Sequence, residues 1–253
     1  MMERFSEWLA ESELGRYLLA REQAFFDRAV ADAFGYHAVQ IGLPAHDFLR
    51  ANRIPMQLRA DVEAPAGLLC LPEALPFAGN SLDLVVLPHT LDFTTHPHQV
   101  LREVERVLMP EGRLVLTGFN PWSLWGVKRV AAGRYEAPWN GQFLSLPRIR
   151  DWLELMEIEP DGGAFMAYAP PFAREDWLRR FAFMEGAGDR WWPLAAGVYG
   201  ISAVKRTRGL RLITPQWGVA KKAARGLAVA AGNDRHRAAR QAGGGGPQEP
   251  GSA

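Results

Sequence analysis

Two side chains that could move a proton follow an apolar segment in the middle of the chain. Leu82 to Leu87 (LDLVVL) is typical of a β-strand buried on both faces of a sheet, and His89 and Asp92 come just after it. Histidine has the side-chain pKa nearest neutrality, so His89 could take a proton from a hydroxyl or an amine, with Asp92 beside it. The structural alternatives are a strand-end histidine satisfied by backbone groups and an aspartate that caps the next helix.

A zinc site is the second kind of chemistry that this region suggests. His89, His96 and His98 lie close together in the sequence, but the last two straddle Pro97 in a loop. No Cys and no paired Glu accompanies them at the spacing of metal ligands. We therefore expect no metal here and a loop that completes the fold.

A strand, a helix and a second strand position these side chains. After the loop, apolar residues recur at steps of three and four, as on an amphipathic helix, and Pro110 and Gly112 end it. Arg113 to Thr117 (RLVLT) is the second predicted strand and leads into Gly118 to Asn120. Parallel strands joined by such a crossover collect ligands at their carboxyl ends, so we expect the site at His89 and at Gly118 to Asn120.

The remaining segments extend the same alternation of helices and strands. The sequence predicts an α/β protein with a Rossmann-like, doubly wound, mainly parallel sheet, an antiparallel edge strand and helices on both faces. The expected helices are Phe5 to Leu19, Arg21 to Phe34, a short one within Pro44 to Asn52, and Leu146 to Leu155. The other expected strands are His37 to Leu43, Ile54 to Asp61, Leu68 to Leu71, Ala164 to Pro171 and Val198 to Lys205.

Composition narrows the class of protein. The 253 residues, 48% of them hydrophobic, can bury a full core, and the single Cys70 excludes an internal disulfide framework. No apolar run approaches the roughly 20 residues of a membrane-spanning helix. Alternating charges near the N-terminus give no apolar signal core. A cytoplasmic bacterial enzyme or binding protein is the expectation.

Charge is divided unevenly along the chain. From Lys205 onward there are ten Lys and Arg against two Asp and Glu, so this part carries +8 and the body −7, which gives the net +1. A segment rich in Gly, Pro and Ser ends the chain, and we expect disorder from about Pro215. The expected organisation is N-terminal helices over residues 1–36, a main domain over 37–206 and a basic tail over 207–253. Weak contact of the tail with an anionic surface is a hypothesis, a solvated tail is the simpler interpretation, and no specific nucleic-acid partner is predicted.

The central segment resembles a known family. LPFAGNSLDLVV, followed after a loop by HQVLREVERVLMPEGRLVLTGFNP, is similar to the C-terminal half of class I S-adenosylmethionine-dependent methyltransferases of the type 11 group. The match covers roughly Leu68 to Asn120. The segment GFNPWSLWG also resembles a bacterial subgroup of this family. The resemblance implies a methyltransferase with S-adenosylmethionine as its cofactor. It also implies the seven-stranded sheet.

The resemblance assigns roles to particular residues, with some departures. At the family's acidic residue and first glycine this chain has Gln40 and Gly42, whereas Pro44 and His46 replace the other two glycines. Asp61 matches the carboxylate that binds the ribose hydroxyls. The family's acidic residue near adenine falls on Leu71, with Glu73 offset from it. The predicted cofactor-binding residues are Gln40, Gly42, Asp61, Glu73, Ala74, Leu75 and Pro88, and the predicted catalytic residues are His89 and Asp92.

Three functional interpretations follow from these departures. The chain is a methyltransferase that holds its cofactor with other groups, or a degenerate domain that acts as a scaffold, or another nucleotide-binding enzyme on the same sheet. Aromatic residues after Asn120 could line the pocket of a small-molecule or lipid-like acceptor, although such residues are most often core. They are Trp122, Trp125, Tyr135, Trp139, Trp177, Phe181, Phe183, Trp191 and Trp192.

Overall fold

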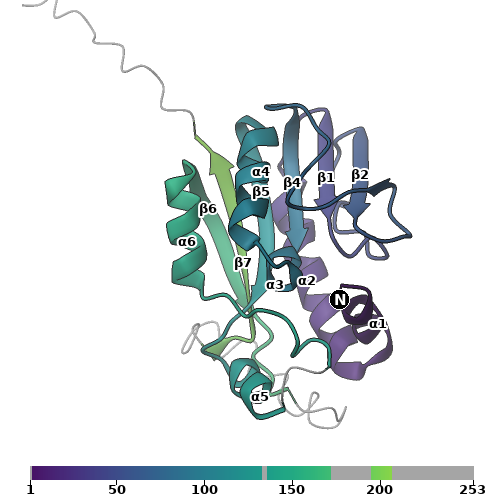
Figure 1. Ribbon diagram of the computed structural model, residues 1–253, viewed down its shortest axis with the longest axis vertical. Helices are drawn as coiled ribbons and strands as arrows, with labels where there is room; N and C mark the ends of the chain where they lie inside the picture. The colour runs from purple at the N-terminus through teal and green to yellow at the C-terminus, as the bar shows by residue number, and fades with distance from the viewer. Residues whose placement is uncertain (1, 133–135, 172–194, 207–253) are drawn as a thin grey trace, which may run out of the picture. The chain divides into compact units, whose positions relative to one another are not determined.

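A seven-stranded sheet forms the centre of the computed structural model, which describes residues 2–132, 136–171 and 195–206. The strand order is β3-β2-β1-β4-β5-β7-β6 (Figure 1). Neighbours from β3 to β5 are parallel, and β7 runs antiparallel to both β5 and β6. The predicted fold class is thereby confirmed. The strands are β1 (His37–Ile41), β2 (Met56–Asp61), β3 (Leu68–Leu69), β4 (Leu82–Pro88), β5 (Leu108–Phe119), β6 (Ile158–Met166) and β7 (Val198–Lys205).

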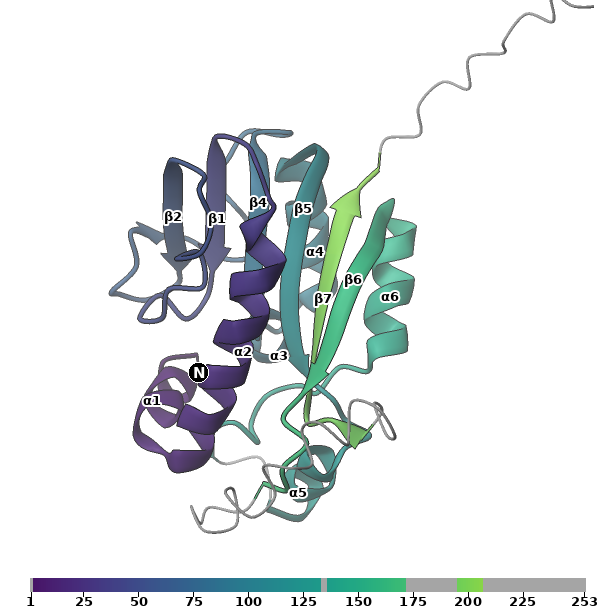
Figure 2. The same cartoon turned by 180° about the vertical axis from the view of Figure 1, so that it is seen from behind.

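Helices cover both faces of the sheet. α4 and α6 pack on the face seen in Figure 1, and α2 packs on the opposite face, seen in Figure 2. α1 lies against α2 near the carboxyl ends of the parallel strands (Figure 2). The helices are α1 (Met2–Glu11), α2 (Glu13–Ala31), α3 (Thr90–Phe93), α4 (Pro97–Val107), α5 (Leu124–Ala132) and α6 (Leu146–Leu155). In the part of the chain that the structure describes, no helix is long and apolar enough to cross a bilayer.

The buried strand β4 behaves as its sequence predicts. Leu84, Val85 and Val86 are fully buried, because β4 lies between β1 and β5 and is covered on both faces. Val85 pairs with Val39 of β1 and with Leu114 of β5. Apolar residues on alternate sides of β4 therefore join the two hydrophobic cores, one on each face of the sheet.

The N-terminal helices differ from the predicted ones in where they divide. The sequence predicted a division near Ala20, but α1 and α2 meet at Ser12. The Ser12 hydroxyl accepts a hydrogen bond from the Gly15 backbone N–H at 2.8 Å, which caps the start of α2. α2 then runs without a break to Ala31. This places its middle, rather than a loop, over the carboxyl end of β4.

The predicted helix within Pro44 to Asn52 is wrong. The side-chain amide of Gln40 of β1 donates to the carbonyl of His46 in this segment and to those of Gly42 and Leu43 just before it, at 2.8–3.0 Å. These carbonyls therefore face a side chain, and the segment forms turns rather than a helix. Leu43 adopts the left-handed conformation with φ +48°.

β6 begins earlier than the sequence predicted. The prediction was Ala164 to Pro171, but pairing with β7 runs from Ile158 opposite Lys205 to Met166 opposite Val198. A proline and two glycines interrupt the apolar pattern of β6, and the register shifts between Pro160 and Gly162. An edge strand tolerates such residues because one side of its backbone is unpaired. The predicted tail and the aromatic residues Tyr135, Trp177, Phe181, Phe183, Trp191 and Trp192 lie outside the described residues.

Two tryptophans near the start of α5 differ in burial, and substituting each of them tests the described packing. Trp125 is 1% exposed and donates from its indole Nε1 to the carbonyl of Ala169 at 3.1 Å, whereas Trp122 is 80% exposed. Trp125→Ala should lower the free energy of unfolding by about 3–5 kcal/mol, because it leaves a large cavity. Trp122→Ala should change it by less than about 0.5 kcal/mol. Urea denaturation of both variants checks this, and similar losses in the two would contradict the described packing.

Candidate active site at the carboxyl ends of the strands

A cleft lies where β1, β2 and β4 end. It contains two cavities, of about 180 and 210 Å³, which share Met2 of α1 and Asp61 of β2. Each is smaller than the roughly 300 Å³ of a typical pocket for a small ligand. The larger cavity is lined by Met2, Gly42, Asp61, Val62, Leu71, Pro72, Glu73, Thr90, Phe93, Thr94 and Thr95.

Gly42 forms the tight turn after β1. Its φ of +92° favours glycine, and a Cβ added there would lie 3.0 Å from the Met2 Cε and from the Thr90 Oγ1. The Thr90 hydroxyl donates to the carbonyl of Ile41 at 2.5 Å, and the carbonyl of Pro88 also faces the turn. The ends of β1 and β4 are thus joined next to a backbone that a ligand can approach closely. The Met2 side chain occupies that approach.

Asp61 ends β2 at the junction of the two cavities. It is 6% exposed and accepts a hydrogen bond on Oδ1 from the Val62 backbone N–H at 2.6 Å. Burial raises the pKa of its carboxyl, and the Val62 N–H opposes that shift. A carboxylate at the end of the second strand is suited to accept hydrogen bonds from two adjacent hydroxyl groups. The structure brings Asp61, Gly42 and Glu73 together around the larger cavity.

Of the predicted cofactor-binding residues Glu73, Ala74 and Leu75, the first lines the cleft and the other two do not. Glu73 lines the larger cavity and accepts a hydrogen bond from the Thr94 hydroxyl. Ala74 is exposed, and Leu75 is buried with its backbone N–H bonded to the Glu103 carboxylate at 3.0 Å. Ala74 and Leu75 line neither of the two cavities.

Gln40 is fully buried and its hydrogen bonds are internal. Its amide nitrogen bonds to three carbonyls of the loop after β1, and its Oε1 accepts from the Phe48 backbone N–H at 3.0 Å. With both ends of the amide occupied, Gln40 contributes to the cleft by holding the shape of the loop that contains Gly42. Its predicted direct contact with a cofactor stays a prediction.

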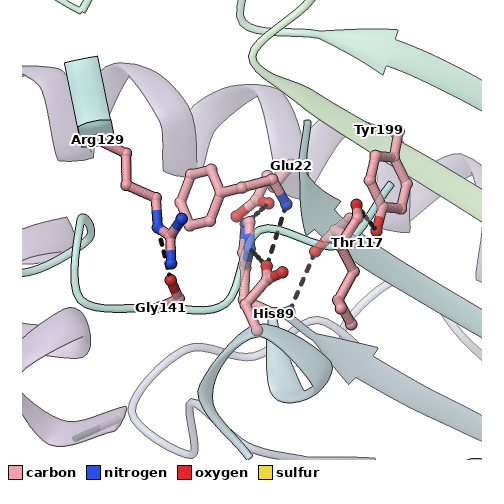
Figure 3. Close-up of polar contacts among 9 residues, drawn as sticks. Glu22, His89, Thr117, Arg129, Gly141 and Tyr199 are labelled. Carbon is pink, nitrogen blue, oxygen red and sulfur yellow. Dashed lines mark hydrogen bonds and ion pairs between the residues drawn. The ribbon is translucent and has the colours of Figure 1, made fainter. Parts of the chain in front are cut away.

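His89 lies between two carboxylates, one of them that of Glu22 (Figure 3). Its Nδ1 lies 2.7 Å from Asp92 Oδ2, and its Nε2 lies 2.5 Å from Glu22 Oε1 of α2. His89 and Glu22 are fully buried and Asp92 is 1% exposed. Asp92 Oδ2 also accepts from the Phe119 backbone N–H at 3.0 Å. We call Glu22, His89 and Asp92 the buried triad.

The contacts within the triad, together with burial, change the pKa values of His89 and Asp92. Burial alone would lower the pKa of His89, but the charge of Glu22 and the hydrogen bonds to both carboxylates raise it to about 9. The pKa of Asp92 is raised as well, because burial outweighs its attraction to the imidazole. His89 is therefore an imidazolium at neutral pH, and both ring nitrogens donate.

Aromatic rings close the space around His89. The Phe119 ring centroid lies 4.1 Å from that of the imidazole, and the Phe5 ring meets it edge to face at 5.1 Å. His89 itself adopts the left-handed conformation, with φ +52° and ψ 11°, at the point where β4 leads into α3. The imidazole is fully buried and lines neither cavity of the cleft. The catalytic roles of His89 and Asp92 stay predictions, and the geometry also gives both residues a structural role.

Glu22 was not identified from the sequence, although a signal for it exists. It follows Leu18 by four residues and precedes Phe25 and Phe26 by three and four, so it lies on the apolar face of its helix. A carboxylate at such a position needs a partner, because burying an unpaired charge is costly. Nothing in the local sequence indicates that this partner is His89, 67 positions away.

The zinc hypothesis finds no support in the described part of the chain. No group of three or more His, Cys, Asp and Glu side chains there could hold a metal ion. His96 bonds to the Thr95 hydroxyl at 2.8 Å, and His98 packs against the edge of Trp152.

Comparison with known sequences shows what the central segment is similar to. Residues 50–116 match the methyltransferase domain family. An uncharacterized protein of Escherichia coli K12, YafS, is 38% identical over 129 residues, which are 50% of this chain and 54% of that protein. The ubiquinone/menaquinone biosynthesis C-methyltransferase UbiE of Cupriavidus taiwanensis is 32% identical over 98 residues, 37% of this chain and 40% of that enzyme. The matched part thus spans about half the length of these curated relatives or less.

Comparison with solved structures extends the likeness to the fold. An S-adenosylmethionine-dependent methyltransferase of Thermotoga maritima, described as a possible histamine N-methyltransferase, superposes with a TM-score of 0.56 at 16% identity. The alignment covers 81% of this chain and all of that one. Geranyl diphosphate C-methyltransferase of Streptomyces coelicolor, solved with S-adenosyl-L-homocysteine, gives 0.53 at 12% identity, over 74% and 77% of the two chains. The fold is therefore that of class I methyltransferases. The sequence matches and the fold together make this chain similar to class I S-adenosylmethionine-dependent methyltransferases.

Alkaline pH should weaken the fold through His89. A histidine pKa raised from 6.5 to about 9 contributes stability that is fully present below pH 6.5 and is lost as the pH rises through 9. The free energy of unfolding should fall by roughly 3 kcal/mol between about pH 6.5 and about pH 10. His89→Asn, which cannot titrate, should be less stable at the lower pH and should lack this contribution to the pH dependence. Equal pH dependence in the two proteins, measured by urea denaturation, would contradict the assignment.

Proposed function

We propose that this chain is an S-adenosylmethionine-dependent methyltransferase whose cofactor site is the cleft between Gly42 and Asp61. The observation that carries the proposal is the position of the Asp61 carboxylate, at the end of β2 and beside the turn at Gly42. The glycine turn gives a ligand access to the backbone, and the carboxylate is suited to ribose hydroxyls. The match of residues 50–116 to the methyltransferase domain family supports the choice of cofactor.

Different residues of the cleft suit different parts of this cofactor. Asp61 would hold the ribose, and Gly42 would admit the methionine portion to the backbone. Leu71 and Glu73 of the same cavity offer an apolar surface and a carboxylate for the adenine. Met2 must leave the face of Gly42 for one ligand to span both cavities. When bound, the cofactor supplies an electrophilic methyl group on a positively charged sulfur.

The remaining residues orient the cleft and exclude water from it. The Thr90 hydroxyl fixes the end of β4 to β1, and the Phe93 ring, stacked on Phe5 at 4.7 Å between centroids, forms an apolar wall. If His89 and Asp92 act in catalysis, they hold a proton close behind that wall. We propose a small-molecule or lipid-like acceptor, in line with UbiE, whose name assigns it to quinone biosynthesis. A cytoplasmic location and contact of the tail with an anionic surface stay predictions.

A scaffold without catalytic activity is the second candidate function. The observations that favour it are the Met2 side chain against Gly42 and the fully occupied amide of Gln40. In such a protein the apolar side chain would take the place of a ligand, and the sheet would persist without one.

Calorimetric titration with S-adenosylmethionine and S-adenosylhomocysteine decides between the two candidates. We expect saturable binding by the unmodified protein. Asp61→Asn should weaken it by roughly 10- to 150-fold, because a lost hydrogen bond to a charged group costs about 1.5–3 kcal/mol. Asp83→Asn is the matched control: that carboxylate accepts from the Tyr36 and His37 backbone N–H groups at the opposite end of the sheet, so affinity should persist. Absence of heat with both ligands would favour the scaffold.

A further inference from the structure

The buried triad contains more negative than positive charge. Two carboxylates, Glu22 and Asp92, share one imidazole, so with both carboxylates ionised a protonated His89 still leaves an excess of one negative charge. Within the described residues, the groups that shift the pKa of Asp92 are His89, the Phe119 N–H and Glu22, and none is a Lys or Arg. Apart from His89, no cation thus acts on Asp92 among the described residues, and burial lowers the pKa of His46, which also feels the charge of Glu22.

Each carboxylate also has one oxygen that lacks a hydrogen-bond partner. Glu22 Oε2 and Asp92 Oδ1 are buried and unpaired among the described residues. A buried charged acceptor without a partner costs free energy, so a native structure that keeps two of them calls for an explanation. A contribution to stability does not explain these two carboxylates, because an apolar residue of similar volume would avoid the cost of burying them.

The triad lies directly behind the wall of the cleft. His89, Thr90, Asp92 and Phe93 belong to one tight turn; Thr90 and Phe93 line the larger cavity, whereas His89 and Asp92 belong to the triad. The Phe5 ring contacts both the imidazole and Phe93, with centroids 5.1 and 4.7 Å away. Aromatic rings and the backbone of the turn thus separate the charge from the cavity. Apolar material screens a charge far less than water does.

We propose that the buried triad makes the cleft prefer a positively charged ligand over an uncharged ligand of nearly the same shape, and that Glu22 sets this preference. The inference rests on the proposed function, which offers such a pair of ligands. S-Adenosylmethionine carries a positive sulfonium, and S-adenosylhomocysteine is its neutral, demethylated counterpart. The same preference would promote release of the neutral product. Glu22 acts through the electrostatic field and touches neither ligand, so it is a specificity-determining residue rather than a catalytic one.

Isothermal titration of Glu22→Gln with both ligands tests this inference. The glutamine keeps the size of the side chain and an oxygen that accepts from His89 Nε2, but it removes one negative charge. Work at about pH 6.5 keeps His89 protonated, since the remaining partner Asp92 still favours the imidazolium. We expect the Kd for S-adenosylmethionine to rise about 3- to 10-fold at low salt and the Kd for S-adenosylhomocysteine to change less than about 2-fold.

Asp27→Asn is the matched control on the same helix. Its carboxylate pairs with Arg50 at 2.6 Å, and this ion pair belongs to neither cavity, so both affinities should persist. If Glu22→Gln does not fold, Asp92→Asn removes the other charge and keeps an acceptor for the Phe119 N–H.

Three results would overturn the inference, and they are distinguishable. Equal weakening for both ligands would mean that the triad acts only by shaping the cleft. Unchanged affinity for both would mean that its charge does not reach the ligand. Failure of the unmodified protein to bind either ligand would overturn the proposed function and the inference with it.

Discussion

One fully buried histidine held between two carboxylates is the constraint on which the arrangement of this protein depends. Around the imidazole of His89 meet α1 through Phe5, α2 through Glu22, α3 through Asp92 and β5 through Phe119. Removing the imidazole would leave two buried carboxylates without a counter-charge, which is far more costly than breaking an exposed ion pair. The N-terminal helices are therefore fixed to the carboxyl end of the sheet by a specific contact as well as by apolar packing.

This contact determines the form of the cleft. Because the triad holds the turn after β4, Thr90 can bond to Ile41 and Phe93 can face the cavity. The loop after β1 is fixed differently, by the Gln40 amide, where the family has an acidic residue and further glycines. A side chain thus holds the shape of this loop, and Gly42 occupies the position whose φ of +92° favours glycine.

The sequence predicted those parts of the structure that local pattern determines. The strand β4 and the amphipathic helix α4 were identified correctly, because burial on two faces and burial on one face give different spacings of apolar residues. The predicted end of α4 at Pro110 and Gly112 was wrong, since α4 ends at Val107 and both residues lie within β5. β7 was found with the boundaries that the structure shows. By contrast, β6 was misplaced because Pro160 and two glycines hide its pairing, and a helix was predicted where Gln40 captures the carbonyls of Gly42, Leu43 and His46.

The sequence predicted only some of the residues of the candidate site. Gly42, Asp61 and Glu73 were named from their spacing and resemblance, and the fold brings them to one cavity. Glu22 was missed because its partner is distant in sequence, and so was Met2, whose contact with Gly42 depends on how α1 packs. Contacts of this kind arise from tertiary structure, and no window of sequence contains them.

The charge state of His89 tests this account most directly. Long-range ¹H–¹⁵N NMR of the protein labelled at histidine distinguishes an imidazolium, with both ring nitrogens protonated, from a neutral ring with one bare nitrogen. The account predicts that His89 has both nitrogens protonated at neutral pH and loses a proton only near pH 9. A neutral His89 ring at pH 7 would contradict the buried triad as described here, and with it the electrostatic preference of the cleft.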